Sequence, residues 1–235
     1  RKMIWMEYHN PVLLNECIEG LNIKPTGIYV DVTFGGGGHS KLILEKLKGG
    51  KLIAFDQDEK TKEHDFKNDD FKLINANFRH LKRFLRMEGV KKIDGLLADL
   101  GVSSHQFDQA ERGFSIRFEG ELDMRMNTDS ILTAKEIINN YTEQELADVL
   151  YKYGELTNSR RIAKEIVASR EKSAIITTKD LTDCIARLVP EKKKNQFLAR
   201  IFQSIRIEVN DEISSLKEML NSAVDVLDTS GRLVI

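Results

Sequence analysis

Residues 28–44 read IYVDVTFGGGGHSKLIL, and this stretch decides the fold. A short apolar, β-branched run ends at Asp31, and four glycines separate it from apolar residues at helical spacing. A strand, a glycine-rich turn and a helix in direct succession are typical of a parallel α/β sheet that binds a nucleotide-like ligand. We therefore predict an α/β fold.

The same alternation of strands and helices continues as far as Asp99. Short apolar runs without polar alternation predict strands that are buried on both faces, as in a parallel sheet. The polar stretches between them carry apolar residues at helical spacing and are interpreted as right-handed crossover helices. Strands are expected at 28–33, 51–55, 71–75 and 93–98, and helices at 41–47 and 79–87.

The stretch from Thr133 to Leu188 has a different periodicity. Its apolar residues recur at intervals of three and four, which indicates helices. Thr142 and Glu145 have the spacing of a capping box at the start of one helix, and Pro190 is expected to stop the last one. This stretch is therefore predicted to be a helical segment inserted into the α/β core.

After the insertion, one long helix is expected with an apolar stripe from Val209 to Leu227, followed by a strand at 232–235. The core is assigned to residues 1–105 and 205–235, and the helical insertion to residues 106–204. A chain that stops on a freshly started strand would leave an apolar sheet edge exposed. We therefore expect this chain to be part of a longer protein whose C-terminal part is missing.

The composition is that of a globular protein. The 235 residues include 36 basic and 37 acidic side chains, and 41% are hydrophobic, which argues against a disordered or collagen-like chain. No apolar run approaches the roughly 18 residues of a membrane span, so no membrane association is expected. Cys17 and Cys184 are far apart and lack metal-ligand spacing, so we expect no metal and a reducing, cytoplasmic location.

Charge is unevenly distributed along the chain. Residues 101–150 hold 4 basic and 10 acidic residues, whereas residues 151–200 hold 12 and 6, so the two segments carry net charges of −6 and +6. Lys192, Lys193 and Lys194 are the densest part of the basic segment. The segregation fits either solvated helix faces or a basic surface that meets phosphate groups.

The glycine run and a downstream acid form a candidate nucleotide site. Glycine lets the backbone pass close to a bound ligand, and Asp56 ends the next predicted strand. An acid at that place can accept hydrogen bonds from both hydroxyl groups of a ribose. The alternative is a flexible turn in which Ser40 caps the following helix. The pair favours a cofactor that contains adenosine.

The loop does not have the GxGxxG arrangement of a dinucleotide site, so no pyrophosphate is required. S-adenosylmethionine, which combines adenine, ribose and an amino acid, suits such a loop. Phe78 follows the third predicted strand and could pack against adenine, although a core position is an equal alternative.

Asp99 begins the sequence DLGVSS at the end of the fourth predicted strand, where α/β sheets bind their ligands. The motifs ERGFS, LDMRM and FQSIRIEVN follow it, and HNPVLL, residues 9–14, precedes the first strand. In this order and at these separations, the motifs resemble those of the bacterial 16S ribosomal RNA (cytosine-N4)-methyltransferase family, of the MraW type. The resemblance covers essentially the whole chain.

The resemblance implies a Rossmann-like class I methyltransferase core with an inserted all-helical domain that helps to bind RNA. It implies an S-adenosylmethionine-dependent enzyme whose partner is 16S rRNA in the small ribosomal subunit, methylated at a cytidine N4 of the decoding centre. Carried over position by position, the cofactor-binding residues are Gly37, Gly38, His39, Asp56, Phe78, Asp99 and Gln106. His105 departs from the family pattern, which usually has proline before this glutamine.

The mechanism requires an acceptor for the cytosine amino group, whose lone pair is delocalised into the ring. Asp99, or a backbone carbonyl of residues 99–103, is the candidate acceptor, and Asp99 is therefore the predicted catalytic residue. The base has to be unpaired or turned out of its stack to reach such a pocket. Candidates for contact with RNA are Arg112, Arg117, Arg125 and Arg206, each of which could instead be a surface or ion-paired arginine.

Two other classes of function stay open on the residues alone. A nicotinamide-dependent oxidoreductase uses a similar strand, glycine loop and acid, but the missing GxGxxG disfavours it. A non-catalytic RNA- or ribosome-binding module on a methyltransferase scaffold is the second alternative, and the intact glycine loop with its acids argues against it. The oligomeric state is left open, with a homodimer among the alternatives.

Overall fold

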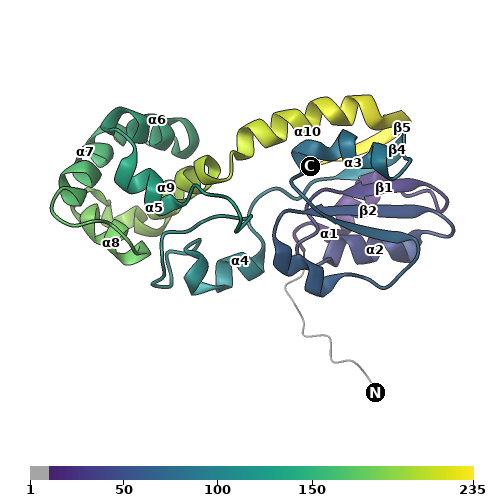
Figure 1. Cartoon of the computed structure of the whole chain (residues 1–235), viewed down its shortest axis with the longest axis horizontal. Helices are drawn as coiled ribbons and strands as arrows, with labels where there is room; N and C mark the ends of the chain where they lie inside the picture. The colour runs from purple at the N-terminus through teal and green to yellow at the C-terminus, as the bar shows by residue number, and fades with distance from the viewer. Residues whose placement is uncertain (1–10) are drawn as a thin grey trace, which may run out of the picture. The chain divides into compact units, whose positions relative to one another are not determined.

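The computed structural model describes residues 11–235. His9 and Asn10 of the HNPVLL motif therefore lie outside the described residues. The chain divides into two compact units (Figure 1). We call Arg1–Ser103 together with Ile213–Ile235 the core unit, and Ser104–Glu212 the helical unit. Within residues 11–235, no helix has both the length and the apolar character needed to cross a membrane.

The core unit contains a five-stranded parallel sheet with the order β3-β2-β1-β4-β5. This order matches the first five strands of the doubly wound arrangement 3-2-1-4-5-6, which confirms the predicted α/β class. The four predicted strands are present with shifts of at most two residues at an end. Their bounds are β1 Ile28–Asp31, β2 Lys51–Asp56, β3 Phe71–Asn75, β4 Ile93–Leu97 and β5 Leu227–Val234.

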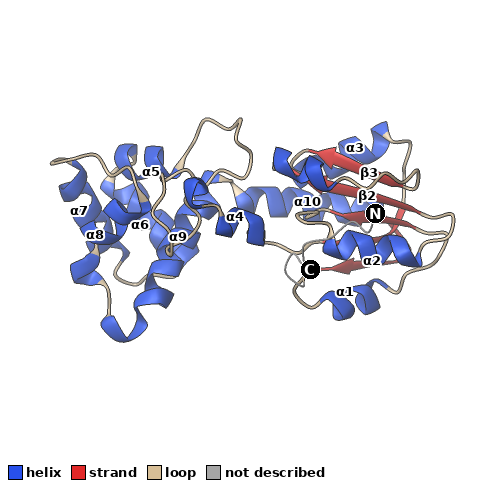
Figure 2. Cartoon of the chain, turned by 90° about the horizontal axis from the view of Figure 1, so that it is seen from below, coloured by secondary structure: helices blue, strands red, loops and turns tan. Residues whose placement is uncertain are grey.

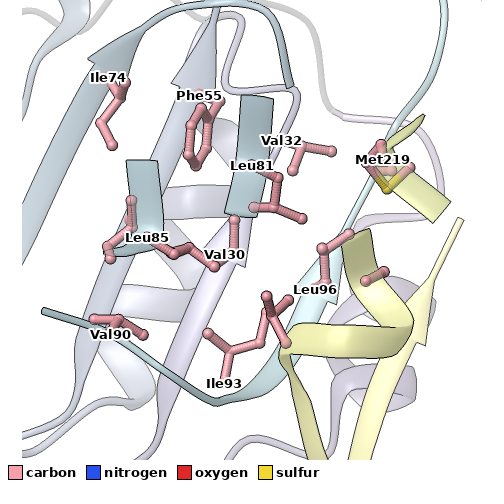
Figure 3. Packing of buried hydrophobic residues seen from close by; sticks show 14 residues of the cluster. Val30, Val32, Phe55, Ile74, Leu81, Leu85, Val90, Ile93, Leu96 and Met219 are labelled. Atoms are coloured by element: carbon pink, nitrogen blue, oxygen red, sulfur yellow. The ribbon is translucent and has the colours of Figure 1, made fainter. Parts of the chain in front are cut away.

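Helices cover both faces of this sheet (Figure 2). On one face, α3 (Leu81–Met87) and α10 (Glu212–Val226) pack against the strands, and Figure 3 shows Leu81, Leu85 and Met219 in contact with this layer. On the other face, α1 (Leu14–Leu21) and α2 (Gly38–Lys46) cover a second cluster. Burial on both faces explains why strands β1, β2 and β4 are largely apolar instead of alternating.

The helical unit has its own core. Its longer helices carry the predicted three-and-four periodicity, and Leu146, Leu150, Ile162 and Leu181 are buried. The predicted capping box at Thr142 is confirmed, because its hydroxyl and the Glu145 carboxylate satisfy each other's backbone amides. The elements are α4 Ser104–Asp108, η3 Ala110–Arg112, α5 Ala134–Asn140, α6 Glu143–Gly154, α7 Ser159–Arg170, α8 Thr178–Cys184, η4 Ala186–Leu188, η5 Glu191–Lys193 and α9 Lys194–Val209.

The predicted long helix is present as α10 (Glu212–Val226), but its expected start at Val209 is wrong. Two helices occupy this region, because α9 ends at Val209 and Asp211 adopts a left-handed backbone with φ of 46°. The side chain of Asn210 fixes the break, since it accepts from the Met126 amide (2.7 Å) and donates to the Met124 carbonyl (2.8 Å). The boundary between the units therefore lies at 212/213, whereas the expected boundary at 204/205 would have cut α9 in two.

The bounds of the final strand also differ from the expectation. The final strand begins at Leu227 and not at residue 232, and all of its side chains are exposed or half-buried. The crossover between β2 and β3 contains a 3-10 helix, η1 (Glu59–His64), and no α-helix. The short interval between these strands leaves too little chain for a full crossover helix.

Candidate cofactor site

The candidate site of the core unit lies at the carboxyl ends of the parallel strands. Strand order reverses between β1 and β4, so the loops after these two strands diverge and leave room for a ligand. Residues 32–37 follow β1 and residues 98–103 follow β4. Asp56, the last residue of β2, lies at the same edge of the sheet because β1 and β2 are parallel and in register.

The glycine loop needs glycine for its backbone geometry. Gly37 has φ of 77° and forms the N-terminal cap position of α2, a conformation that side chains rarely tolerate. A Cβ placed on Gly37 would lie 2.8 Å from the ring of Phe66 and 3.0 Å from that of Phe34. Among the described residues, a Cβ on Gly36 would meet no atom within 4 Å. The loop is thus packed on one side and open at Gly36.

We expect Gly37→Ala to destabilise the protein by about 2 kcal/mol, because it combines backbone strain with a clash against two aromatic rings. For a chain of this length, that loss corresponds to a melting temperature lower by about 4–8 °C. Gly36→Ala is the matched control and should melt within about 2 °C of the wild type. Equal melting temperatures for the two variants, measured by circular dichroism, would contradict this account.

Asp56 links the end of β2 to the glycine loop. Its Oδ2 accepts a hydrogen bond from the Gly35 amide (2.8 Å), and its Oδ1 accepts one from the Asp58 amide (2.9 Å). A carboxylate has about four acceptor positions, so about two stay available for the hydroxyl groups of a ribose. Burial raises the pKa of Asp56 to about 6 even though both backbone bonds act in the opposite direction.

The loops that follow β1 and β4 are connected by a series of hydrogen bonds that sequence reasoning missed. Asp31 is buried and accepts from the Ser40 hydroxyl (2.7 Å) and from the Thr33 amide (3.0 Å). The Thr33 hydroxyl oxygen in turn accepts from the Asp99 amide (2.7 Å). Ser40 therefore does not cap α2, as the alternative interpretation proposed, but holds the end of β1. The sequence signal that could have indicated this role is that Asp31 is an acidic residue at the end of a buried strand.

Asp99 presents its carboxylate to the site. Its backbone amide is held by Thr33, while its side chain is 45% exposed and therefore accessible to a substrate. His39 lies nearby, with its Nδ1 4.0 Å from Asp99 Oδ2. The other ring nitrogen, Nε2, lies 3.2 Å from the carbonyl oxygen of Val12, and the ring is buried. His39 thus joins the segment before α1 to the glycine loop.

Phe78 lies at the start of η2 (Phe78–His80), directly after β3. The Asn77 side chain caps this turn by accepting from the Arg79 amide (2.9 Å), and its amide nitrogen donates to Gln57 Oε1 (2.9 Å). Phe78 is half-buried and packs against the cluster beneath α3 and α10. It therefore combines a core contact with partial access, so the two interpretations of this residue are compatible. Gln57 and Asn77 are polar neighbours that sequence reasoning did not identify.

Gln106 is the one predicted cofactor contact that belongs to the helical unit. It lies on α4 and is buried within the part of the chain that the structure describes. The six other predicted contacts belong to the core unit, namely Gly37, Gly38, His39, Asp56, Phe78 and Asp99.

Three of the four arginines predicted to contact RNA have bonding partners inside the helical unit. Arg112 is buried and donates to the Arg125 carbonyl (2.8 Å), and Arg125 forms a bidentate pair with Asp123 (2.9 and 2.7 Å). Arg206 forms a bidentate pair with Glu212 (2.7 and 3.0 Å). These contacts assign structural roles to the three side chains. Arg117 is exposed and has no ion pair to another described residue.

The described residues contain no group of three histidine, cysteine, aspartate or glutamate side chains that could hold a metal ion. Cys17 and Cys184 are free thiols, both half-buried.

Comparison with known proteins gives consistent matches over nearly the whole chain. Residues 6–235 match the MraW methylase family. The ribosomal RNA small subunit methyltransferase H of Christiangramia forsetii is 54% identical over 232 residues, which are 98% of this chain and 77% of that protein. The proteins of the same name from Flavobacterium johnsoniae (54% over 231 residues, 98% and 76%) and Phocaeicola vulgatus (51% over 229 residues, 97% and 75%) are similar to it as well.

Proposed function

This chain belongs to the MraW methylase family, and from that premise we propose that it methylates the exocyclic N4 of a cytidine in 16S ribosomal RNA. It is an S-adenosylmethionine-dependent ribosomal RNA methyltransferase, in agreement with the names of its relatives. The decoding centre of the small subunit is the proposed location of the target cytidine. The observation that carries the proposal is the family match over residues 6–235, together with the intact glycine loop and its acids.

The residues of the core unit fit S-adenosylmethionine. The open side of the loop at Gly36 leaves space beside the backbone, and Asp56 retains acceptor capacity for ribose hydroxyl groups. Phe78 would hold the adenine, and residues Gly37 to His39 would lie beside the ribose and methionine parts. When bound, the cofactor supplies a methyl group that is already electrophilic because it is attached to a sulfonium.

The protein's chemical task is to orient a weak nucleophile. The Asp99 carboxylate is proposed to accept a hydrogen bond from the cytosine N4 amino group, which localises the nitrogen lone pair and withdraws a proton as the new bond forms. Thr33 fixes the backbone of Asp99, so the acceptor is positioned before the substrate arrives. The exposed carboxylate is the only part of this chain to which we assign a catalytic role.

Binding of the RNA is proposed to involve the helical unit. The segment 151–200 carries a net charge of +6, which favours contact with phosphate groups, and Arg117 stays a candidate contact because it is exposed. Such a substrate also implies the cytoplasm, where ribosomal subunits are assembled, as the place of action.

The alternatives are disfavoured by the same observations. Relatives that are about half identical over nearly all of the chain are named methyltransferases, which does not fit a non-catalytic scaffold or a nicotinamide-dependent oxidoreductase.

The direct test uses methyl-labelled S-adenosylmethionine and small ribosomal subunits from cells that lack this modification. We expect label in N4-methylated cytidine, identified by mass spectrometry after digestion of the RNA. Unmodified transcript without ribosomal proteins serves as the second substrate and shows whether an assembled subunit is required. Cofactor binding without transfer to either substrate would contradict the proposed activity, and label in another nucleoside would contradict the proposed target.

A further inference from the structure

A small hollow on the helical unit lies where α6 ends and α9 begins. Its volume is about 150 Å³, below the roughly 300–1,000 Å³ of sites that hold a whole small-molecule ligand. It is lined by Leu156, Pro190, Lys193, Gln196, Phe197 and Arg200.

The local backbone builds this hollow in a defined way. Gly154 ends α6 so close to α9 that a Cβ on it would lie 3.0 Å from the Arg200 carbonyl oxygen. Glu155 then adopts a left-handed backbone with φ of 51°, and its amide bonds back to the Tyr151 carbonyl (3.0 Å), as in an αL helix cap. This turn directs Leu156 into the interior, where it is buried and forms the floor.

The lining combines two kinds of chemistry. Leu156, Pro190 and the half-buried ring of Phe197 supply an apolar, partly aromatic surface. Lys193 and Arg200 are exposed and cationic, and the six lining residues, all in the described part of the chain, include no acid. The hollow also belongs to the segment with a net charge of +6.

An aromatic surface flanked by cations is the arrangement with which proteins bind single-stranded nucleic acid, because bases stack on the ring and the cations contact the phosphates. The side-chain amide of Gln196 can donate to and accept from a base edge. The volume has room for one base and not for a base pair. An acidic or purely apolar peptide would leave either the ring or the cations without a matching partner.

We propose that this hollow binds one unpaired nucleotide of the ribosomal RNA substrate, with the base against Phe197 and the adjoining phosphates on Lys193 and Arg200. The inference rests on the proposed function and adds a docking site on the helical unit, separate from the residues assigned to cofactor binding and catalysis. It assigns specificity to substrate docking and not to the chemical step.

Three variants test the site one feature at a time. Phe197→Leu keeps apolar volume but removes the aromatic face, while Lys193→Ala and Arg200→Ala each remove one cation. We expect each to raise KM for small ribosomal subunits by about fivefold or more, with kcat and affinity for S-adenosylmethionine within twofold of the wild type. Lys192→Ala is the matched control, because it removes the same charge from the neighbouring position but does not line the hollow.

A second measurement reports on the phosphate contacts. Binding of a fluorescent single-stranded RNA of about 12 nucleotides is followed against salt concentration, and each cation variant should lower the slope of log K against log salt by about 0.7. Phe197→Leu should weaken binding and leave the slope unchanged. Circular dichroism verifies that each variant is folded before comparison.

The outcomes separate this inference from the proposed function. If the wild type transfers no methyl group to small subunits, the proposed function fails. If the wild type is active and the three variants keep the wild-type KM and salt slope, the docking site is wrong while the function stands. An equal effect of Lys192→Ala and Lys193→Ala would also overturn the site, because it would show that RNA binding depends on general positive charge and not on the hollow.

Discussion

Asp99→Ala is expected to lower the rate of methyl transfer by about 10²–10⁴-fold, the range typical of a positioned proton acceptor. The carboxylate is the exposed acid at the end of β4, and its backbone is anchored by Thr33. Alanine removes the acceptor, so the cytosine amino group would keep its lone pair delocalised in the ring. Single-turnover kinetics at saturating S-adenosylmethionine isolates this step from cofactor binding.

Two further variants make the result specific. Asp99→Asn keeps an acceptor oxygen but no negative charge, so its rate should fall between those of the wild type and Asp99→Ala. Asp69→Ala removes an exposed acid from the loop before β3 and should be as active as the wild type. If Asp99→Ala retained both the wild-type rate and the wild-type cofactor affinity, Asp99 would be excluded from both roles.

Periodicity was sufficient to predict the first four strands of the core unit because each of them contributes buried side chains to the clusters on both faces of the sheet. Val30 and Ile53 contact the cluster under α3 and α10, while Tyr29 and Leu52, their sequence neighbours, contact the cluster under α1 and α2. A strand of this kind has to be apolar throughout, and that signal is local in sequence.

The break between α9 and α10 could not be predicted in this way. Val209 and Ile213 continue an apolar stripe at helical spacing across the break. What interrupts the helix is the Asn210 side chain, which bonds to the backbone of Met124 and Met126, 84 and more positions earlier in the sequence. A tertiary hydrogen bond of this kind does not change the hydrophobic periodicity of the sequence.

The candidate site divides in the same manner. The distance of Asp56 from the glycine run predicts a ribose acceptor, because such an acid follows the strand after the loop, and this role stays a prediction. The roles of Ser40 and Thr33 depend on contacts with Asp31 and Asp99 that only the folded loops create. For Arg112, Arg125 and Arg206, residue type alone could not separate a bidentate internal partner from an RNA phosphate, and the fold supplies internal partners.

Asp56 makes the affinity for S-adenosylmethionine depend on pH. Burial raises the pKa of this carboxyl to about 6, and its ionised form is the better acceptor for ribose hydroxyl groups. Between pH 7 and pH 5, the ionised fraction falls about tenfold, so the dissociation constant should rise by up to about tenfold. Isothermal titration calorimetry at the two pH values measures this change.

The same shift in pKa affects the stability of the protein without cofactor. The folded state holds a proton on Asp56 up to about pH 6, whereas the unfolded chain releases it near its ordinary pKa of 3.8. The free energy of unfolding therefore falls as pH rises from about 4 to about 6, by about 3 kcal/mol from this group. Burial also raises the pKa of Asp31, which acts in the same direction. Bound S-adenosylmethionine should reduce this loss of unfolding free energy at the higher pH.

Asp56→Asn separates these contributions. The amide cannot ionise, so the variant should bind S-adenosylmethionine about 10–100-fold more weakly at pH 7, consistent with the loss of hydrogen bonds to a charged group. Its affinity should then hardly change between pH 7 and pH 5. If Asp56→Asn instead retained the wild-type pH dependence, Asp56 would not be the titrating group and would serve only to hold the Gly35 amide.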